Sequence, residues 1–364
     1  MTMKKLLISI IFVFSPFVLS AQDVESRLAL PSLTFDNPNL QRLASRAEAQ
    51  YNDPDDGNIF EVPEKWEGKE WQLAILNYFT AVATCKEVVN SEGEPTESAS
   101  GAEVEIVRSA MFDKYLAAIM KPLPKSQPAR LDALNERVGE LLENMEFLTE
   151  GTMYEINAYA SYEADLRMYV AQRFAREEYA KVGNESLKDL LMEEEVLFRQ
   201  FSAALTELYF NYHLCVAGWG VYYSMLPLET GTFWASVEEE RVESLKRASA
   251  LLGLTTYEDV EALEDELDEG LTAKYEGALM DFMQNISNEE IDEEVRKETN
   301  ESLQRVLSVF SEFSDKRNEI VEQLPVAHQK DYKMDSLHYF HVLIGVLNGD
   351  FDEGYEEEGE DAVE

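Results

Sequence analysis

The sequence has few of the residues from which metal and redox sites are built. Its 364 residues include only 2 cysteines and 4 histidines. No Cys-x-x-Cys pair, His-Glu-x-x-His motif, glycine-rich phosphate loop or serine nucleophile motif occurs. These absences argue against a zinc centre, a thiol redox centre and a nucleotide-binding loop. We therefore expect a protein that is not an enzyme and that needs no cofactor.

Proline and glycine are also sparse, at 11 and 17 residues. They cluster between segments whose apolar residues recur every three to four positions, which is the helical period. No segment shows the convincing alternation of apolar and polar residues that is typical of a strand. The sequence therefore predicts an all-α protein made of helical bundle units.

Basic residues are outnumbered, because 31 Lys and Arg stand against 72 Asp and Glu. The formal net charge is -41. Such a chain repels phosphates, so nucleic acid is not expected as a partner. It attracts cationic partners, and a basic protein is the partner we expect. The alternative is that the charge serves solubility or adaptation to salt.

The N-terminus has the features of a secretory signal peptide. Lys4-Lys5 precedes an apolar run over residues 6–19, and the small residues Ser20-Ala21 follow it. The run is shorter than the roughly 20 residues that a bilayer span needs. We expect cleavage after Ala21 and a periplasmic or secreted protein without a membrane span.

Two interpretations of the cysteines stay open. In an oxidising compartment Cys85 and Cys215 would form a disulfide that closes a large loop of the unfolded chain. Otherwise they are two small buried apolar side chains.

Polar and proline-containing stretches divide the chain. Residues 1–21 are the signal peptide, and 22–65 are an N-terminal extension with a short helix over 40–51. Residues 66–150 indicate three helices, over 66–89, over 104–120 and from Pro128 onward. A central helical unit over 151–254 and a C-terminal helical unit over 255–349 follow. The acidic residues 350–364 predict a disordered tail.

The helical pattern also predicts elements inside the last two units. We expect helices over 152–181, 232–252 and 271–286, and one long helix or a broken pair of helices over 187–225. A further helix is expected to open with a capping box at Ser287 and to end before Pro325. The last helix is expected over 331–348.

An internal echo raises the question of duplication. The residues Asn184-Glu185-Ser186-Leu187 return as Asn300-Glu301-Ser302-Leu303. Each copy is followed by a phenylalanine pair, Phe198/Phe201 in one case and Phe310/Phe313 in the other. One interpretation is a duplicated helical unit, with the C-terminal unit as the diverged copy. The other is similarity between two amphipathic helices that use the same few residue types.

One stretch resembles a known family. The pattern Thr152-x-x-Glu155-Ile156-Asn157 is similar to the signature that opens the LprI-type lysozyme inhibitor domain, and later motifs of that domain are similar to Phe198-Arg199 and to Arg241. The resemblance covers residues 149–252 and lacks the cysteines of the family. It implies an exported helical binding domain, with Glu155, Asn157, Arg199 and Arg241 as its motif residues. An acidic inhibitor would then face a cationic lysozyme.

Aromatic residues gather in the middle of the same stretch. Tyr209, Tyr212, Trp219, Tyr222 and Tyr223 lie within a short span. They would line an apolar groove for a peptide, lipid or sugar ligand. Alternatively they form the core or the join between two units.

The C-terminal unit carries a candidate metal face. Asp335, His338 and His341 are spaced three apart on a predicted helix, so they could share one face. With a carboxylate from another helix they would complete a metal site. The alternative is a surface or packing role.

The sequence leads to one main hypothesis and two alternatives. The main hypothesis is an exported, non-enzymatic helical binding protein of the cell envelope, similar to lysozyme inhibitors. The first alternative is a structural or scaffold protein without a ligand site. The second is a hydrolase that depends on metal or on carboxylates, although runs such as Glu193–Glu195 bring acids together by chance and do not define a cleft.

Overall fold

The computed structural model describes residues 32–51, 87–89, 95–98, 106–107, 110, 124–150, 153–217, 225–254, 270–288 and 291–349. In this part of the chain the fold is all-α, as predicted, apart from one small sheet. None of its helices is both long enough and apolar enough to cross a bilayer. The chain forms two units, residues 1–173 and residues 174–364.

The first unit contains α2 (Pro38–Tyr51), α5 (Gln127–Met145), the short 3-10 helix η3 (Glu146–Glu150) and most of α6 (Met153–Tyr179). The observed α2 and α5 confirm the helices predicted over 40–51 and from Pro128. A proline in the first turn suits a helix start, because that turn leaves its N–H groups unpaired. Each helix buries one apolar stripe, such as Leu134, Val138 and Leu141 on α5.

The small sheet corrects the sequence prediction. Strands β1 (Glu87–Val89) and β2 (Pro95–Ser98) pair antiparallel, with Glu87 opposite Ser98. The helix predicted over 66–89 is therefore wrong at its last residues, and the segment between it and the helix predicted over 104–120 contains a strand. Strands this short cannot show an alternating pattern. Residues 66–86, most of 104–120, the expected signal peptide and the acidic tail lie outside the described residues.

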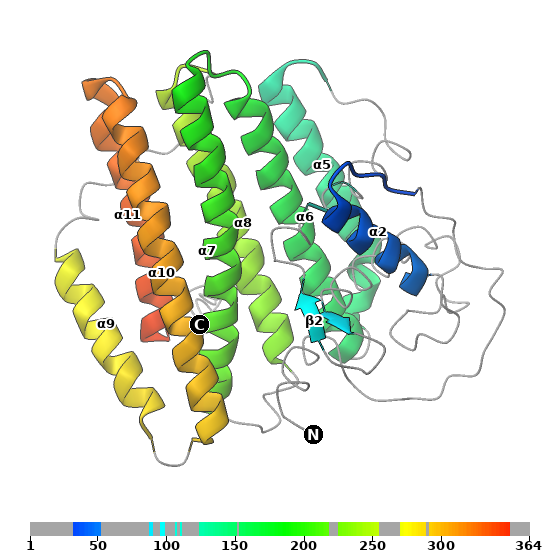
Figure 1. Cartoon of the computed structure of the whole chain (residues 1–364), viewed down its shortest axis with the longest axis vertical. Coiled ribbons are helices and arrows are strands. Elements are labelled where there is room, and N and C mark those ends of the chain that lie inside the picture. The colour runs from blue at the N-terminus through cyan, green and yellow to red at the C-terminus, as the bar shows by residue number, and fades with distance from the viewer. Residues whose placement is uncertain are drawn as a thin grey trace, which may run out of the picture. The chain divides into compact units, whose positions relative to one another are not determined.

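The described residues of the second unit form five long helices, labelled in Figure 1 as α7 (Glu185–Ala217), α8 (Leu226–Leu251), α9 (Leu271–Ile286), α10 (Glu293–Gln323) and α11 (Val326–Asn348). Helices α7 and α10 lie side by side and run antiparallel. The Gln323 amide near the end of α10 donates to the Ser186 hydroxyl near the start of α7, at 3.4 Å. At the other end the Thr299 hydroxyl donates to the Asn211 carbonyl at 3.1 Å.

An aromatic core joins α7 to α10. The ring centroids of Phe201 and Phe313 lie 5.7 Å apart in a stacked arrangement, and those of Phe198 and Phe313 lie 5.9 Å apart. Phe310 packs on Phe201 at 5.2 Å. The two phenylalanine pairs of the internal echo thus pack against each other. The rest of the echo is not structurally equivalent, because Asn184 caps the start of α7 whereas Asn300 lies inside α10.

Several helix starts differ from the prediction. Helix α8 begins at Leu226 and not at Thr232, since Pro227 sits in its first turn instead of ending the previous helix. Helix α10 begins at Glu293, because the Asp292 carboxylate accepts hydrogen bonds from the first turn and acts as the N-cap. The capping box predicted at Ser287 is therefore wrong. Helix α9 confirms the prediction over 271–286.

Candidate functional site

The second unit places charged residues where its helices should be apolar. On α7, Glu194 falls between Leu191 and Phe198 in the buried stripe, and its side chain is fully buried. On α10, Arg317 falls between Phe313 and Ile320 and is also buried. An isolated charge at such a position is very costly, so each must meet a partner of opposite sign.

Glu194 is the centre of the resulting network. Arg241 of α8 binds it through two parallel hydrogen bonds, from Nη1 to Oε1 at 2.8 Å and from Nη2 to Oε2 at 2.6 Å. Arg317 donates from Nη1 to Oε1 at 2.7 Å, and the Tyr179 hydroxyl donates to Oε2 at 3.3 Å. Two guanidinium groups from two other helices therefore share one carboxylate.

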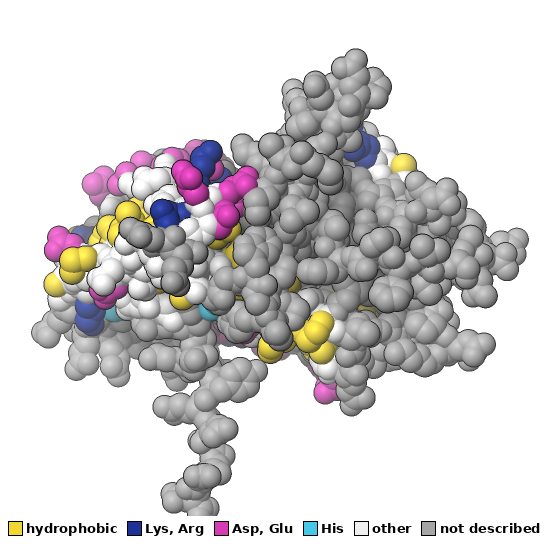
Figure 2. All heavy atoms as spheres, turned by 90° about the horizontal axis from the view of Figure 1, so that it is seen from below, with side chains coloured by type: hydrophobic (Ala, Val, Ile, Leu, Met, Phe, Trp, Pro, Cys, Tyr) yellow, Lys and Arg dark blue, Asp and Glu magenta, His cyan; other side chains and the backbone are white. Residues whose placement is uncertain are grey.

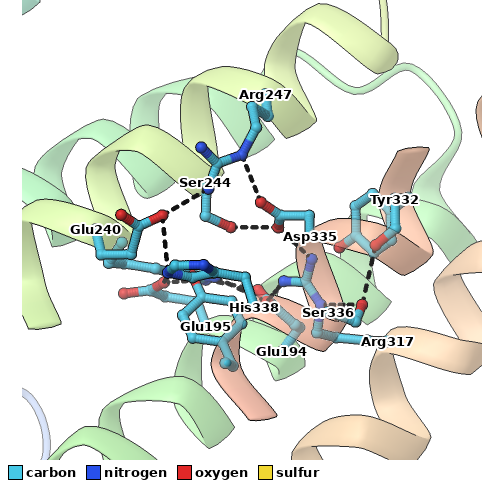
Figure 3. Close-up of polar contacts among 12 residues, drawn as sticks. Glu194, Glu195, Glu240, Ser244, Arg247, Arg317, Tyr332, Asp335, Ser336 and His338 are labelled. Atoms are coloured by element: carbon cyan, nitrogen blue, oxygen red, sulfur yellow. Dashed lines mark hydrogen bonds and ion pairs between the residues drawn. The ribbon is translucent and has the colours of Figure 1, made fainter. Parts of the chain in front are cut away.

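Asp335 of α11 is the second centre, and Figure 3 shows it between Arg247, Ser244 and Arg317. Arg317 Nη2 donates to Oδ2 at 2.6 Å, and Arg247 Nε donates to Oδ1 at 2.7 Å. The Ser244 hydroxyl adds a third donor at 2.5 Å. Because Arg317 also holds Glu194, it links the two centres. Its Nε donates to the Ser336 hydroxyl at 2.7 Å.

A third centre lies between α7 and α8. The buried Glu238 forms an ion pair with Arg199 and accepts from the Ser202 hydroxyl at 2.7 Å and from Trp234 Nε1 at 3.1 Å. Glu195 bridges this centre to the first one. It accepts from Arg199 Nε at 2.9 Å and from Arg241 Nη2 at 2.6 Å.

The outer edge of these contacts is formed by His338 and Glu240. His338 Nε2 lies 3.2 Å from Glu240 Oε1, and Arg247 Nη2 donates to the same oxygen at 2.7 Å. Both side chains are partly exposed. We call the whole set the ion-pair network; it comprises Glu194, Glu195, Glu238, Glu240, Asp335, Arg199, Arg241, Arg247 and Arg317, with His338 at its edge.

Aromatic rings stabilise the buried guanidinium groups. The Phe198 ring lies 4.3 Å from the Arg241 guanidinium carbon and 4.6 Å from that of Arg199. The Tyr332 ring lies 4.4 Å from that of Arg317. Ring faces are negative, so these contacts favour the charged form of each arginine.

The network fixes the charge of its carboxylates. Burial raises the pKa of Glu194, but Arg241 and Arg317 outweigh burial and hold that pKa below its usual value. Asp335 behaves alike: burial raises its pKa, and Arg317 and Arg247 lower it further than burial raises it. Burial lowers the pKa of His338 despite the nearby Glu240. Glu194 and Asp335 are therefore ionised at neutral pH and are poor general acids.

The carboxylates of the network are paired with groups of the protein itself. They accept from arginines, hydroxyl groups and an indole, and the chemistry of the network is that of a structural ion-pair cluster. Such buried clusters add little net stability over apolar packing, but breaking one partner is costly. The ion pairs link α7, α8, α10 and α11, so their expected effect is to select how these helices pack.

The residues that carry the resemblance to the LprI-type domain lie in different parts of the structure. Arg199 and Arg241 are buried members of the network. Asn157 lies half-buried on α6 in the first unit. Glu155 lies on the same helix, and its side chain is outside the described residues. The two arginines therefore hold the fold together.

The residues of the predicted metal face lie on α11, where Asp335 and His338 have other partners. In the described part of the chain no group of three or more His, Cys, Asp or Glu is arranged to hold a metal ion. Asp335, His338 and His341 do share α11, but the Asp335 carboxylate faces Arg317 and Arg247. A carboxylate neutralised by two arginines is not available as a metal ligand.

The described members of the aromatic cluster lie in the core. Tyr209 is buried and stacks on Phe233 at 4.3 Å. Tyr212 packs on Phe282 at 4.4 Å, and its hydroxyl accepts from the Asn285 amide at 2.8 Å. Trp219, Tyr222 and Tyr223 lie outside the described residues. The core interpretation therefore holds for the first two tyrosines.

Cys215 of α7 is buried, and it has no disulfide partner among the described residues. Burial raises its pKa, which keeps it protonated and unreactive at neutral pH. Cys85 lies outside the described residues, so the disulfide remains a prediction.

Comparison of the chain with protein-family models, with curated proteins and with solved structures returned no match.

Sequence reasoning missed the centre of the network. It named Arg199, Arg241, Asp335 and His338 for other reasons, and it gave no role to Glu194 or Arg317. The available signal was a charged residue at an apolar-stripe position, as at Glu194 and Arg317. That signal identifies a buried charge without identifying its partner.

Proposed function

We propose that this chain is an exported, non-enzymatic helical protein of the cell envelope that binds a cationic partner protein. The resemblance to the LprI-type inhibitors implies that this partner is a lysozyme. The observation that carries the proposal is the distribution of charge. Opposite charges are nearly balanced inside the second unit, whereas its surface is rich in unbalanced acid.

The interior accounts for little of the net charge. In the ion-pair network four arginines face five carboxylates, with His338 beside the fifth. The formal charge of -41 therefore resides almost entirely outside the network.

The surface of α10 illustrates the excess. Its exposed acidic residues are Glu293, Glu301, Glu312, Asp315, Glu319 and Glu322. Its exposed basic residues, Lys297 and Arg305, are each paired with a carboxylate, Glu301 and Glu207. Figure 2 shows Asp and Glu side chains gathered along the upper edge of the described part, with few Lys and Arg among them.

This distribution suits a partner of opposite charge. A surface with excess negative charge raises the rate at which a cationic protein arrives and repels anionic competitors. Salt screens such attraction over about 10 Å at 0.1 M ionic strength. Binding should therefore weaken steeply as salt is added.

The direct test is a lysozyme activity assay with the purified protein at low and at high salt. The proposal predicts inhibition at low salt that decreases as salt rises. A polyglutamate of matched total charge controls for simple polyanion effects and should inhibit less at equal charge. Absence of inhibition together with absence of binding at low salt would overturn the proposal, whereas binding without inhibition would remove only the inhibitor function.

A scaffold function is the second candidate, and one observation favours it. Tyr209 and Tyr212, which a ligand groove would need, are buried in the core. A scaffold protein would bind neither lysozyme nor other cationic proteins at low salt. The same assay at low and high salt, with binding measured beside inhibition, therefore separates the two candidates.

A further inference from the structure

The outer side of α7 carries an exposed stripe. Glu185, Asp189, Met192 and Val196 recur every three to four residues, so they lie on one face of the helix. Met192 is 39% exposed and Val196 is 50% exposed. Met192 and Val196 are one helical turn apart and together form a small exposed apolar surface on this face.

Acidic side chains surround these two apolar residues. The Glu185 and Glu193 side chains are 76% and 61% exposed. Asp189 is exposed, and no ion pair links it to another described residue. The nearby Lys188 is paired with Glu185 at 3.3 Å. The stripe is therefore apolar in its middle and negative around it.

One lysine of α10 lies between acidic residues of α7 and α10. Lys316 Nζ lies 2.9 Å from Glu193 of α7 and 2.8 Å from Glu319 of α10. Hydrogen bonds from Lys316 to Glu319 and Glu193 raise its pKa, so it stays charged and is held by its own neighbours. Asp315 and Glu312 are exposed on the same part of α10.

We propose that the α7 face, defined as Glu185, Asp189, Met192, Glu193 and Val196, docks a cationic amphipathic segment of a partner protein. An apolar side chain of the partner covers Met192 and Val196, and lysines or arginines on either side reach the surrounding carboxylates. The proposal rests on the proposed function and assigns it a surface.

A second exposed apolar site provides the matched control. On α9, Met280 is 67% exposed and Met283 is 45% exposed, with Asp281 between them. Among the described residues of α9 the exposed acidic side chains are Glu276 and Asp281, and the exposed Lys274 lies on the same helix. Apolar exposure is thus similar on α7 and α9, whereas charge complementarity to a basic segment favours α7.

The test measures affinity for a defined probe, a synthetic helical peptide of leucine and lysine with its leucines on one face. A peptide of the same composition in scrambled order lacks that face. The α7 variant Asp189→Asn/Met192→Ser/Val196→Ser is compared with the α9 variant Asp281→Asn/Met280→Ser/Met283→Ser. We expect the amphipathic peptide to bind the α7 variant about tenfold more weakly and the α9 variant within about twofold of wild type.

Each other outcome has a defined meaning. Equal affinity of wild type and α7 variant, or equal losses in the two variants, would overturn the docking face and leave the proposed function standing. Equal binding of the scrambled peptide would overturn the apolar part of the contact. If wild type binds no cationic polypeptide at low salt, the proposed function itself fails. If the α7 variant folds poorly, the variant Glu185→Gln/Asp189→Asn is measured in its place. It leaves the apolar residues unchanged and should bind the amphipathic peptide several-fold more weakly than wild type.

Discussion

At the scale of single residues, the main feature is that buried charges are satisfied by one another. Glu194, Arg241 and Arg317 occupy positions that an apolar residue would fill. Each carboxylate oxygen of Glu194 meets at least one guanidinium nitrogen within 2.8 Å. The energetic consequence is asymmetric, because removing one partner leaves the remaining buried charges with less compensation.

Replacing Arg241 by methionine tests this asymmetry. Arg241→Met removes one of the two arginines that hold Glu194, so we expect a loss of about 3–5 kcal/mol in the free energy of unfolding. Arg305→Met removes an exposed ion pair with Glu207 and should change that free energy by less than about 1 kcal/mol. Urea unfolding of both variants measures the difference. A loss as small for Arg241→Met as for Arg305→Met would contradict the account.

Acid should weaken the same network. The pKa of Asp335 is lower in the folded protein than its usual value of 3.8. Its contribution to stability is therefore fully present above that value and is lost as pH falls through the folded pKa. The difference in melting temperature between wild type and Asp335→Asn should be large at pH 7 and should shrink as pH falls below about 4. A difference that grows with acid would show that the sign is wrong.

At the scale of the helix, sequence predicts interiors better than ends. The apolar repeat locates α9 correctly and most of α7, because the repeat follows from the period of the helix itself. The start of a helix depends on which polar side chain reaches the unpaired backbone N–H groups of its first turn. Both Ser287 and Asp292 have suitable side chains, and only the path of the chain decides between them.

The start of α10 can be tested by mutation. The Asp292 carboxylate accepts from Glu294 N at 2.9 Å and from Val295 N at 3.4 Å. Asp292→Ala should therefore cost about 1 kcal/mol of stability. Ser287→Ala removes only a hydroxyl that donates to the Gln284 carbonyl at the end of α9, and it should cost less. Thermal unfolding of the two variants measures both losses of stability. A larger loss for Ser287→Ala than for Asp292→Ala would support the capping box predicted from the sequence.

At the scale of the whole molecule, charge and fold class were predictable and the network was not. Composition indicates an acidic protein, and the helical period of its apolar residues indicates an all-α fold. The network joins residues far apart in the chain, such as Glu194 and Arg317, whose separation is 123 positions. Helical periodicity shows that each is buried but carries no information about which helices lie side by side. For the same reason the sequence did not show that the Asp335 partners come from α8 and α10.

The central proposal is that the protein binds a cationic partner through its surface charge. The balanced charges of the interior and the acidic surface support it. Titration calorimetry of the purified protein with lysozyme tests it most directly, at about 20 mM and about 500 mM salt. The account predicts saturable binding at low salt and an affinity at least tenfold weaker at high salt. Absence of binding at low salt, or an affinity that does not change with salt, would contradict it.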